Sequence, residues 1–408
     1  MKTRVMRVLG TAGALGALTL LSLAGSSGVA SASAAPAQPA HPVTAASPRL
    51  HGFQPEAASF TTPTWGVVLG GYGRTAGHAV RAELAVTADG GAHWSLMRAP
   101  RVWLDNPGLR GQQVDRVVFA GRSNGWLYYQ YNTRVIWATH DGGASWQETT
   151  LPGNVQAMAS SAHAVYAVAG NRLYHSPLGR NAWTQVRAWP WYGSMTGNTL
   201  AVSGDTVWFS NGTFLWRTAD GVRWARYPLR SPGTYYGAPY ELAGIAAASP
   251  RYVAFLYASP GGMFHTGMKV MISFNGGRTA WPTRQVPPPQ GNVAAFAMAP
   301  GRYGALAIGV VTPGLDNIYR SASMGQAWTT FAIQGTSGGA TLSSLQFMRP
   351  GTACLVTGNP EPGATARCSG RRTPARPGTR SGSDPVGRPG PWSRPARPFC
   401  SALGHRAA

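Results

Sequence analysis

Cysteines, acidic residues and long apolar runs are all scarce in this 408-residue chain. The three cysteines, Cys354, Cys368 and Cys400, lie near the C-terminal end, so the body of the chain is not built on a disulfide framework. Beyond the first 34 residues, no stretch approaches the roughly 18 apolar residues of a membrane-spanning helix. Asp and Glu number 13 against 35 Lys and Arg, which leaves few candidates for the paired carboxylates of a glycosidase.

Motifs for several other chemistries are absent as well. The histidines are scattered and no HExxH or CxxC pairing occurs, so we expect no metal site and no cofactor. No glycine-rich loop ends in the Lys-Ser/Thr of a phosphate-binding loop, and no nucleic-acid-binding pattern is present. We therefore assign no catalytic residue and expect no nucleic-acid partner.

The first 34 residues have the pattern of a secretory signal peptide. Lys2, Arg4 and Arg7 precede an apolar segment over residues 8–24, and a cleavage site follows at residues 32–34. We therefore predict a signal peptide over 1–34 and a Pro- and Ala-rich linker over 35–58. The mature protein is expected to be secreted, with no membrane span after cleavage.

An eight-residue motif, Ser/Thr-x-Asp-x-Gly-x-x-Trp, recurs along the chain. Residues 87–94 and 139–146 match it fully, and looser copies end at Trp183, Trp224, Trp281 and Trp328. The Trp residues are about 47 positions apart on average, which is typical of a four-stranded propeller blade.

Each motif predicts a turn between two strands. The Asp accepts backbone N–H bonds, the Gly residues permit positive φ, and the Trp packs over the turn. The predicted turn residues are Thr87, Asp89, Gly91 and Trp94; Thr139, Asp141, Gly143 and Trp146; Thr218, Asp220 and Trp224; Ser273, Asn275, Gly277 and Trp281; and Ser321, Gly325 and Trp328.

These motifs resemble the Asp-box, or BNR, repeat over roughly residues 60–330. The family includes sialidases, xyloglucan-type glycoside hydrolases, sortilin-like receptors and the photosystem II assembly factor. The resemblance implies a β-propeller in which the boxes are structural turns at the blade periphery rather than the active site.

The expected fold is therefore all-β, a β-propeller over residues 59–360. Seven four-stranded blades are favoured, with six as the alternative and an incomplete last blade considered. Seven apolar strands that precede box positions mark the expected blade starts, near Trp65, Gly125, Ala164, Thr206, Tyr252, Ala305 and Ala353.

Residues 361–408 differ from the rest, being rich in Arg, Pro and Gly. One interpretation is a disordered basic tail. The other starts from the absence of a seventh box after the strand at residues 352–358. Read one nucleotide upstream, the codons of residues 364–379 permit the sequence GDGALFRSADAGATWN, a full box whose Trp falls 50 positions after Trp328. This reading predicts a frame slip near 355–363.

Two loops carry candidate ligand-binding residues, and simple loop packing is the alternative for both. The first contributes Trp103, Asp105 and Arg110; the second contributes Tyr235, Tyr236, Tyr240 and Glu241. The resemblance to sialidases implies that a Tyr beside Glu241 could act as a nucleophile, although the sialidase Arg-Ile-Pro signature is missing. A carboxylate pair at the loop face, Asp105 or Asp115 with Glu241 or Asp316, would indicate a hydrolase.

Positive charge pervades the chain. The formal net charge is +22, and the nine Arg and two acids of residues 361–408 contribute +7 of it. Such a field favours polyanions, although a GC-rich genome would also enrich Arg. We predict a monomeric, non-catalytic propeller that binds a carbohydrate, an anionic envelope polymer or a protein on one face. The alternative is a sialidase-like or xyloglucanase-like glycoside hydrolase.

Overall fold

The computed structural model describes Leu50 and residues 53–73, 79–105, 112–130, 133–170, 172–188, 200–259, 267–283, 286, 292–299, 304–311, 317–332, 341–349 and 352–358. The regular elements in these ranges are all β-strands. No helix in them is long and apolar enough to cross a bilayer.

Six antiparallel sheets have four strands each. The first contains β1 (Phe53–Phe60), β2 (Gly66–Tyr72), β4 (Glu83–Thr87) and β5 (Ser95–Met97). The second contains β7 (Arg116–Ala120), β8 (Asn124–Tyr128), β9 (Val135–Thr139) and β10 (Gln147–Thr150). The third contains β11 (Val155–Ser160), β12 (Ala164–Ala169), β13 (Arg172–Pro177) and β14 (Thr184–Ala188).

The remaining three sheets repeat the same order. The fourth contains β15 (Leu200–Ser203), β16 (Thr206–Ser210), β17 (Phe214–Thr218) and β18 (Ala225–Pro228). The fifth contains β21 (Glu241–Ala247), β22 (Val253–Ser259), β23 (Gly267–Ser273) and β24 (Trp281–Pro282). The sixth contains β25 (Asn292–Met298), β26 (Leu306–Val311), β27 (Asn317–Ser321) and β28 (Thr329–Ala332).

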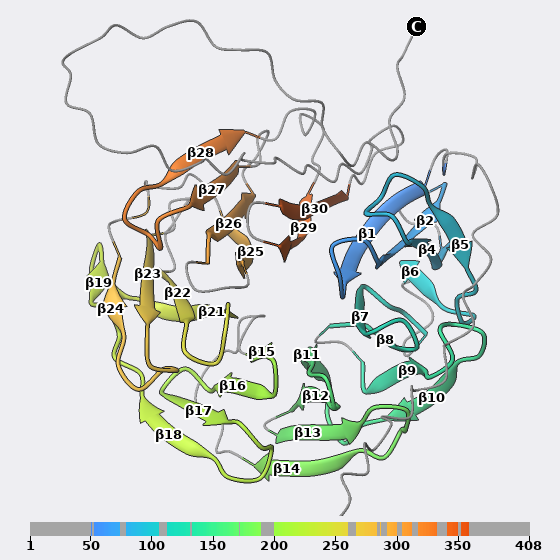
Figure 1. The fold of residues 1–408 in the computed structure, drawn as a ribbon, viewed down its shortest axis with the longest axis horizontal. Helices are drawn as coiled ribbons and strands as arrows, with labels where there is room; N and C mark the ends of the chain where they lie inside the picture. The colour runs from blue at the N-terminus through green and yellow to red at the C-terminus, as the bar shows by residue number, and fades with distance from the viewer. Residues whose placement is uncertain are drawn as a thin grey trace, which may run out of the picture. The chain divides into compact units, whose positions relative to one another are not determined.

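The first strand of each sheet is the innermost one, and these strands form a ring. β1, β7, β11, β15, β21 and β25 contact one another in succession. β25 then contacts β29 (Thr341–Arg349), which pairs with β30 (Thr352–Gly358), and both of these strands contact β1. The propeller prediction is confirmed: the described ranges contain six four-stranded blades and two strands of a seventh, β29 and β30 (Figure 1).

Two boundary predictions were wrong. β1 begins at Phe53, inside the range 35–58 that was predicted as a linker. The strands expected to start the blades are β2, β8, β12, β16, β22, β26 and β30, which are the second strands. The inner strands were not predicted because several of them, such as β21 and β25, are rich in Ala. Small side chains suit strands that converge at the axis, but they leave a weak apolar pattern.

The core lies between neighbouring blades. Leu69 and Leu84 of the first blade, for instance, pack against Phe119 and Leu127 of the second, and all four side chains are buried. Each such side chain contributes roughly 1.5–3 kcal/mol when it leaves water. Face-to-face sheet packing of this kind replaces the disulfides that the body of the chain lacks.

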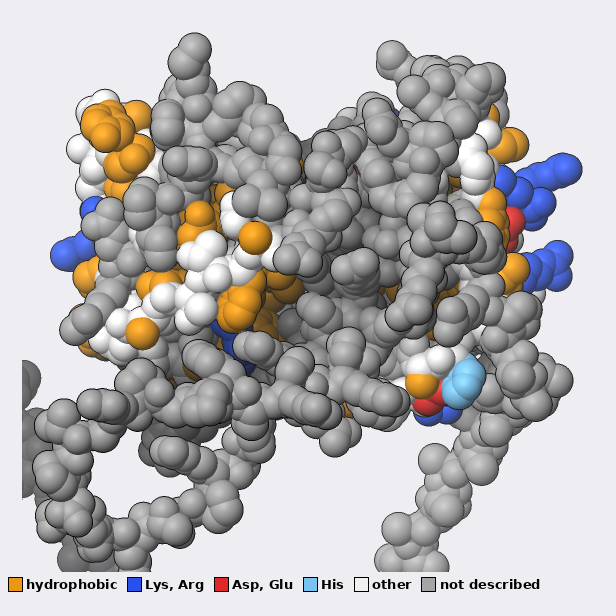
Figure 2. Space-filling model, turned by 90° about the horizontal axis from the view of Figure 1, so that it is seen from above, with side chains coloured by type: hydrophobic (Ala, Val, Ile, Leu, Met, Phe, Trp, Pro, Cys, Tyr) orange, Lys and Arg blue, Asp and Glu red, His pale blue; other side chains and the backbone are white. Residues whose placement is uncertain are grey.

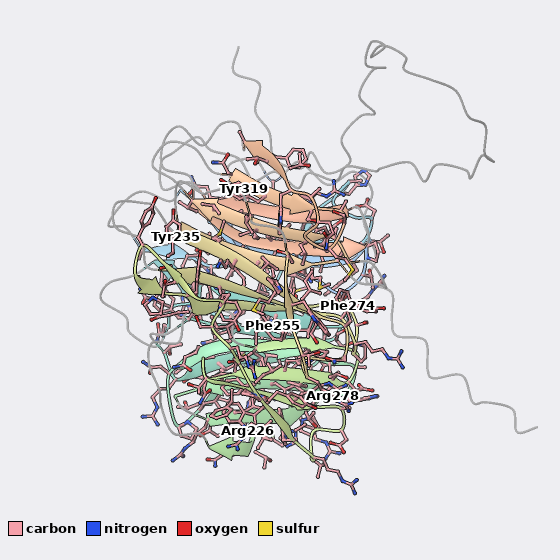
Figure 3. All side chains as sticks on the ribbon, turned by 90° about the vertical axis from the view of Figure 1, so that its left-hand side faces the viewer. Arg226, Tyr235, Phe255, Phe274, Arg278 and Tyr319 are labelled. Atoms are coloured by element: carbon pink, nitrogen blue, oxygen red, sulfur yellow. The ribbon has the colours of Figure 1, made fainter. Side chains whose placement is uncertain are left out.

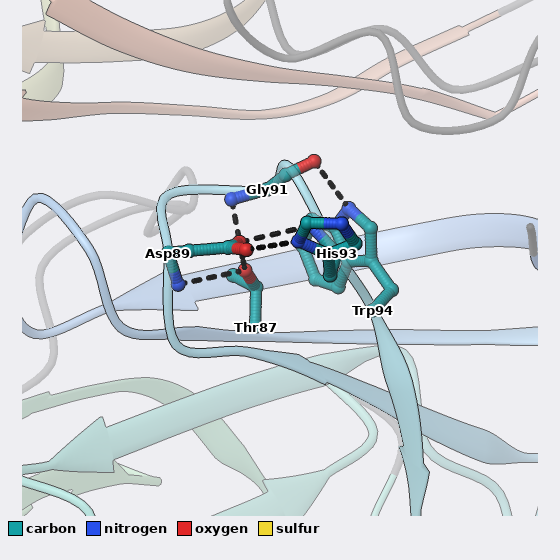
Figure 4. Close-up of polar contacts among 5 residues, drawn as sticks. All are labelled: Thr87, Asp89, Gly91, His93 and Trp94. Atoms are coloured by element: carbon teal, nitrogen blue, oxygen red, sulfur yellow. Dashed lines mark hydrogen bonds and ion pairs between the residues drawn. The ribbon is translucent and has the colours of Figure 1, made fainter. Parts of the chain in front are cut away.

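The repeated turn joins the third and fourth strands of a blade (Figure 4). The Thr87 hydroxyl donates to Asp89 Oδ1 at 2.9 Å and accepts the Gly91 N–H at 2.8 Å. Asp89 Oδ1 also accepts the His93 N–H at 2.9 Å, and Trp94 Nε1 donates to the Gly91 carbonyl at 3.0 Å. These bonds satisfy the backbone groups that a tight turn withdraws from the ladder.

Four other turns repeat the central bond. A Ser or Thr hydroxyl accepts a Gly N–H at 2.7–2.9 Å in the pairs Thr139–Gly143, Thr218–Gly221, Ser273–Gly277 and Ser321–Gly325. Desolvation alone would raise the pKa of Asp141, but bonds from the Ser145 hydroxyl and N–H outweigh it and lower that pKa to about 2. The carboxylate is therefore ionised over the ordinary pH range.

The fifth blade departs from the pattern at its Trp. Trp281 follows one extra residue and is 50% exposed, whereas Trp94 is 8% exposed. The Trp281 ring lies 5.9 Å from the ring of Phe274, itself an exposed turn residue. The prediction that every motif Trp covers its turn was therefore wrong here, because the insertion moves the ring outward.

The two faces of the ring carry different connections. The repeated turns and the links between first and second strands lie on one face, which we call the turn face. The other connections lie on the opposite face, which we call the loop face. Tyr235 and Phe274, on these two kinds of connection, stand at opposite edges of the molecule in Figure 3.

Candidate binding site

A short hairpin on the loop face presents an exposed tyrosine. β19 (Thr234–Tyr235) and β20 (Ala238–Pro239) are joined by Tyr236 and Gly237, which both have positive φ values, 47° and 83°. Tyr236 is 91% exposed. A non-glycine residue in this region costs roughly 1–3 kcal/mol, and such strain is concentrated at functional sites. The hairpin holds an apolar ring in water at that cost.

Neighbouring groups support this ring from behind. Tyr235 packs edge-on against Tyr236 with ring centroids 4.5 Å apart, and Tyr240 lies 6.3 Å from Tyr235. Lys269 Nζ sits 4.9 Å from the centroid of the Tyr240 ring and donates to the Pro232 carbonyl at 3.0 Å. The result is an aromatic platform, Tyr235, Tyr236 and Tyr240, with a fixed cation at its base.

Gly267 lets the platform approach the fifth blade. A Cβ atom at Gly267 would lie 2.4 Å from Tyr235 Cγ, so only glycine fits beneath this ring. The Ser231 hydroxyl bonds the carbonyls of Gly233 and Tyr240 at 3.1 Å each, which fixes the base of the hairpin. The platform is thus built into the fold.

The chemistry of these tyrosines differs from that of a tyrosine nucleophile. Burial raises the pKa of Tyr240, and desolvation together with the neighbouring Tyr236 raises that of Tyr235. A nucleophile needs the opposite shift. Glu241 is exposed at the start of β21, and in the described ranges no hydrogen bond joins its carboxylate to the three tyrosine hydroxyls. The described contacts therefore give no support to a Tyr–Glu nucleophile pair.

A second polar cluster lies on the loop face at the start of the inner strands. Asp115 Oδ1 accepts the Gln130 N–H at 2.7 Å, and its Oδ2 lies 3.5 Å from Arg116 Nη1. Arg116 Nε donates to Gln130 Oε1 at 2.9 Å, and Gln130 Nε2 donates to the Gln156 carbonyl at 2.7 Å. This network ties the second blade to the third.

β-Bulges place two further residues at this cluster. The ladders of β1 and β11 each skip one residue, Glu56 and Gln156 respectively. Bulges re-aim side chains. Gln156 is 9% exposed, and its Oε1 is buried without a hydrogen-bond partner. The equivalent skipped residues in the fifth and sixth blades are Ala243 and Ala294, which bring no polar group to the axis.

The carboxyl of Asp115 is strongly perturbed. Desolvation by burial is the largest cause; Arg116 and the Gln130 N–H oppose it, while the charge of Glu56 adds to it, and together they raise the pKa to about 6. Two carboxylates with different environments are typical of acid–base sites. Sequence analysis did not predict that Glu56 acts on Asp115, because Glu56 lies in the range predicted as a linker.

The other predicted residues either belong to a separate pair of strands or lie outside the described residues. Trp103 lies in β6 (Trp103–Asp105), which pairs with β3 (Val80–Arg81) beside the first two blades. The side chain of Asp105 lies outside the described residues, as do Arg110 and Asp316. No three His, Cys, Asp or Glu side chains gather into a possible metal site in the described ranges.

Residues 121–125 read Gly-Arg-Ser-Asn-Gly, which fits the letters of a hydrolase nucleophile motif. The structure places them at the hairpin between β7 and β8. A nucleophile elbow requires a turn from a strand into a helix. Ser123 is therefore a hairpin residue, whose carbonyl accepts the Gly142 N–H at 2.9 Å.

A cavity of about 450 Å³ lies at the opposite end of the inner strands. Ends of β1, β7 and β11 line it, together with Val202 and Gln346. Side chains bridge its wall: Ser59 Oγ accepts the Phe119 N–H at 2.9 Å, and the Ser160 hydroxyl donates to the Phe119 carbonyl at 3.1 Å. These bonds satisfy inner-edge backbone groups.

Charge is distributed unevenly along the sequence. Residues 221–332 contain nine Lys and Arg but only two acids, Glu241 and Asp316. Figure 2 shows Lys and Arg side chains projecting at the outer edges of the side it presents. Arg226 and Arg278 mark the fourth and fifth blades in Figure 3. Lys269 and the exposed Arg230 belong to the loop face, near the platform, whereas Arg223, Arg251 and Arg278 belong to connections of the turn face.

Comparison with known proteins supports the fold. The sequence matches no protein-family model and no curated protein. YCF48 from Cyanidioschyzon merolae aligns with a TM-score of 0.50 and 16% identity, over 77% of this chain and 95% of that one. The GH74 xyloglucanase from Xanthomonas campestris aligns with a TM-score of 0.51 and 16% identity, over 78% of this chain but only 52% of that one.

A third solved structure, virginiamycin B lyase from Staphylococcus aureus, aligns with a TM-score of 0.49 and 12% identity, over 74% of this chain and 92% of that one. The alignments with YCF48 and the xyloglucanase establish a β-propeller fold and, at 16% identity, nothing finer.

Proposed function

We propose that the chain is an exported propeller of the Asp-box type. Five turns share one hydroxyl-to-glycine bond, and Asp89, Asp141 and Asp220 occupy the same position in three of them. The N-terminal 34 residues support export by their signal-peptide pattern.

We further propose that the loop face binds carbohydrate through the aromatic platform. The observation that carries this proposal is the 91% exposure of Tyr236 on a strained, braced hairpin. The ring is polar at its edge and apolar on its face, and the C–H face of a pyranose stacks on such a surface. Rigid tyrosines also lose little conformational entropy on binding.

The preferred ligand is an acidic glycan. Lys269 is fixed beneath the platform, and the exposed Arg230 lies in the same loop-face connection as the hairpin. A cationic surface concentrates a polyanion and speeds its association, an effect that salt weakens. Uronic-acid or phosphate-bearing polymers therefore suit this face better than neutral ones.

Binding of the purified mature chain to acidic and neutral polysaccharides, measured by calorimetry and affinity electrophoresis, tests both steps. We expect Tyr236→Ala to weaken binding at least tenfold without changing the melting temperature. Phe274→Ala is the matched control, since it removes an exposed aromatic ring from the turn face of the neighbouring blade. Equal binding by Y236A and wild type would overturn the proposal.

A glycoside hydrolase is the second candidate, and the Asp115–Glu56 pair favours it. A carboxyl with a pKa of about 6 beside a second carboxylate can serve as general acid. Release of reducing ends from an acidic glycan, abolished by both Asp115→Asn and Glu56→Gln, would establish hydrolysis. Binding without hydrolysis would favour the non-catalytic proposal.

A further inference from the structure

The seventh blade differs from the other six at the outer edge of its second strand, β30. Each of the six complete blades continues from its second strand to a third, then through a turn to a fourth. In the seventh blade β29 pairs with β30, and no other strand of the described ranges pairs with β30. Its outward N–H and C=O groups form a template for one more strand.

Among the described residues, the adjoining face of the first blade has no such partner. In the other interfaces, apolar residues from the outer strands of one blade pack against the next blade, as Leu84 does toward the second. The cluster on this side of the first blade contains Phe53, Phe60, Val68 and Trp94, and its described members all precede the second blade. A third strand and turn on β30 would pack against this cluster.

The complete blades define what such a hairpin must contain. The residue three positions before the turn's first Ser or Thr is always Leu, Ile or Val, and it packs toward the following blade. These residues are Leu84, Ile136, Leu173, Leu215, Val270 and Ile318. The next residue packs toward the preceding blade, as Trp137, Trp216 and Tyr319 do.

The upstream reading of codons 364–379 meets these requirements. It places Leu three positions before its Ser, and Phe next, so that ALFRS aligns with Asn317–Ser321. The apolar residue is forced: Cys368 supplies the bases TG, and every codon ending in TG encodes Leu, Met or Val. In the shifted frame the first two bases of each present codon become the last two of the new one. Gly378 supplies GG, which permits the Trp codon TGG, and Thr373 supplies AC, which permits the Asp codon GAC.

We propose that the β30 edge is the docking site for a two-stranded hairpin with the sequence GDGALFRSADAGATWN, encoded one nucleotide upstream of the present frame. The hairpin adds the third strand, the turn and the start of the fourth strand. Its backbone pairs with β30, its Leu and turn residues face the first blade, and its Phe faces the sixth. The seventh blade is then closed like the others.

Peptide complementation tests the docking site on the chain as it stands. The peptide GDGALFRSADAGATWN is added to the mature protein and followed by calorimetry, thermal unfolding and hydrogen exchange. We expect saturable binding, a melting temperature that rises with peptide concentration, and slower exchange at residues 352–358. A peptide with Leu, Phe and Trp replaced by Ser is the matched control and should not bind.

Two results would overturn the proposal: no binding of the peptide, or binding that leaves the exchange of residues 352–358 unchanged. A second variant replaces residues 364–379 with the peptide sequence, and we expect it to melt several degrees higher than the present chain. Sequencing of the natural coding DNA across codons 350–380 should reveal one nucleotide gained or lost. An unaltered frame would overturn the part of the proposal that concerns the coding sequence, because the hairpin would then not be made.

Discussion

The amide of Gln346 bonds both backbone polar groups of Phe60, which lies 286 residues earlier in the chain. Its Oε1 accepts the Phe60 N–H at 2.9 Å, and its Nε2 donates to the Phe60 carbonyl at 2.7 Å. One side chain of β29 therefore joins the last sheet to the first strand. This closure requires an amide, since only an amide supplies an acceptor and a donor in one plane.

Gln346→Ala should loosen the ring. Two partly buried backbone groups would lose their partners, at a cost of about 1–3 kcal/mol in the free energy of unfolding. Urea unfolding of Q346A measures this cost, with Gln185→Ala as control, because Gln185 is exposed on β14. Faster hydrogen exchange in β1 and β29 should accompany the loss. Equal stability of the two variants would show that ring closure rests on other contacts.

Gly277→Ala should be more damaging than Gly121→Ala. Both residues have positive φ, 96° and 67°, so each substitution incurs about 1–2 kcal/mol of backbone strain. At Gly277 the new Cβ would also lie 2.3 Å from Cδ2 of the buried Leu215, whereas nothing lies within 4 Å at Gly121. Overpacking should add about 1–3 kcal/mol at Gly277. Chemical denaturation of the two variants checks the difference, and equal losses would contradict it.

Trp94 and Trp281 occupy matching motif positions, but their replacement by Ala should lower the stability of the protein to different extents. Trp94 is 8% exposed and packs edge-on against Phe60 at 6.4 Å, so Trp94→Ala should cost about 3–5 kcal/mol. Trp281 is 50% exposed, and its loss should cost about 1 kcal/mol or less. Melting curves of W94A and W281A decide the matter. A large loss for W281A would mean that its contact with Phe274 supports the blade.

The repeat architecture was predictable because its signals are local. The turn motif packs a hydroxyl, an acid, glycines and a Trp into eight residues, and the bonds they make lie within the same turn. The number of complete blades was harder to predict from the sequence. β29 and β30 have ordinary strand sequences, and only the absence of the turn motif from the sequence that follows them distinguishes the seventh blade.

The candidate site was predictable only in part. Adjacent Tyr and Gly residues marked the β19–β20 hairpin, because the platform comes from one loop. The polar cluster around Asp115 contains Glu56, Asp115 and Gln156, which come from three different blades. These residues lie near one another only because the inner strands form a ring. No local sequence pattern predicts contacts between residues so far apart in the chain. The Ala- and Pro-rich sequence around Glu56 instead indicated a linker.

The raised pKa of Asp115 predicts a specific pH dependence of stability. The folded value is about 6 and the unfolded value about 3.9, so the folded state holds this proton more tightly. The associated stability is fully present below about pH 4 and is lost as the pH rises through 6. At 1.36 kcal/mol per unit, the loss amounts to about 3 kcal/mol.

Asp115→Asn should remove this dependence. Asn keeps an oxygen to accept the Gln130 N–H but cannot ionise, so D115N should gain stability relative to wild type between pH 4 and 7. Urea unfolding at half-unit pH steps measures the difference in the free energy of unfolding between the two proteins. The contribution of the histidines is the same in both and cancels in this difference. Glu56→Gln should lower the pKa of Asp115, because it removes a neighbouring negative charge, and carbon NMR of the carboxyl reports that directly. Parallel stability curves for wild type and D115N would show that Asp115 stays ionised throughout this range, and the case for a protonated acid at the axis would fall with them.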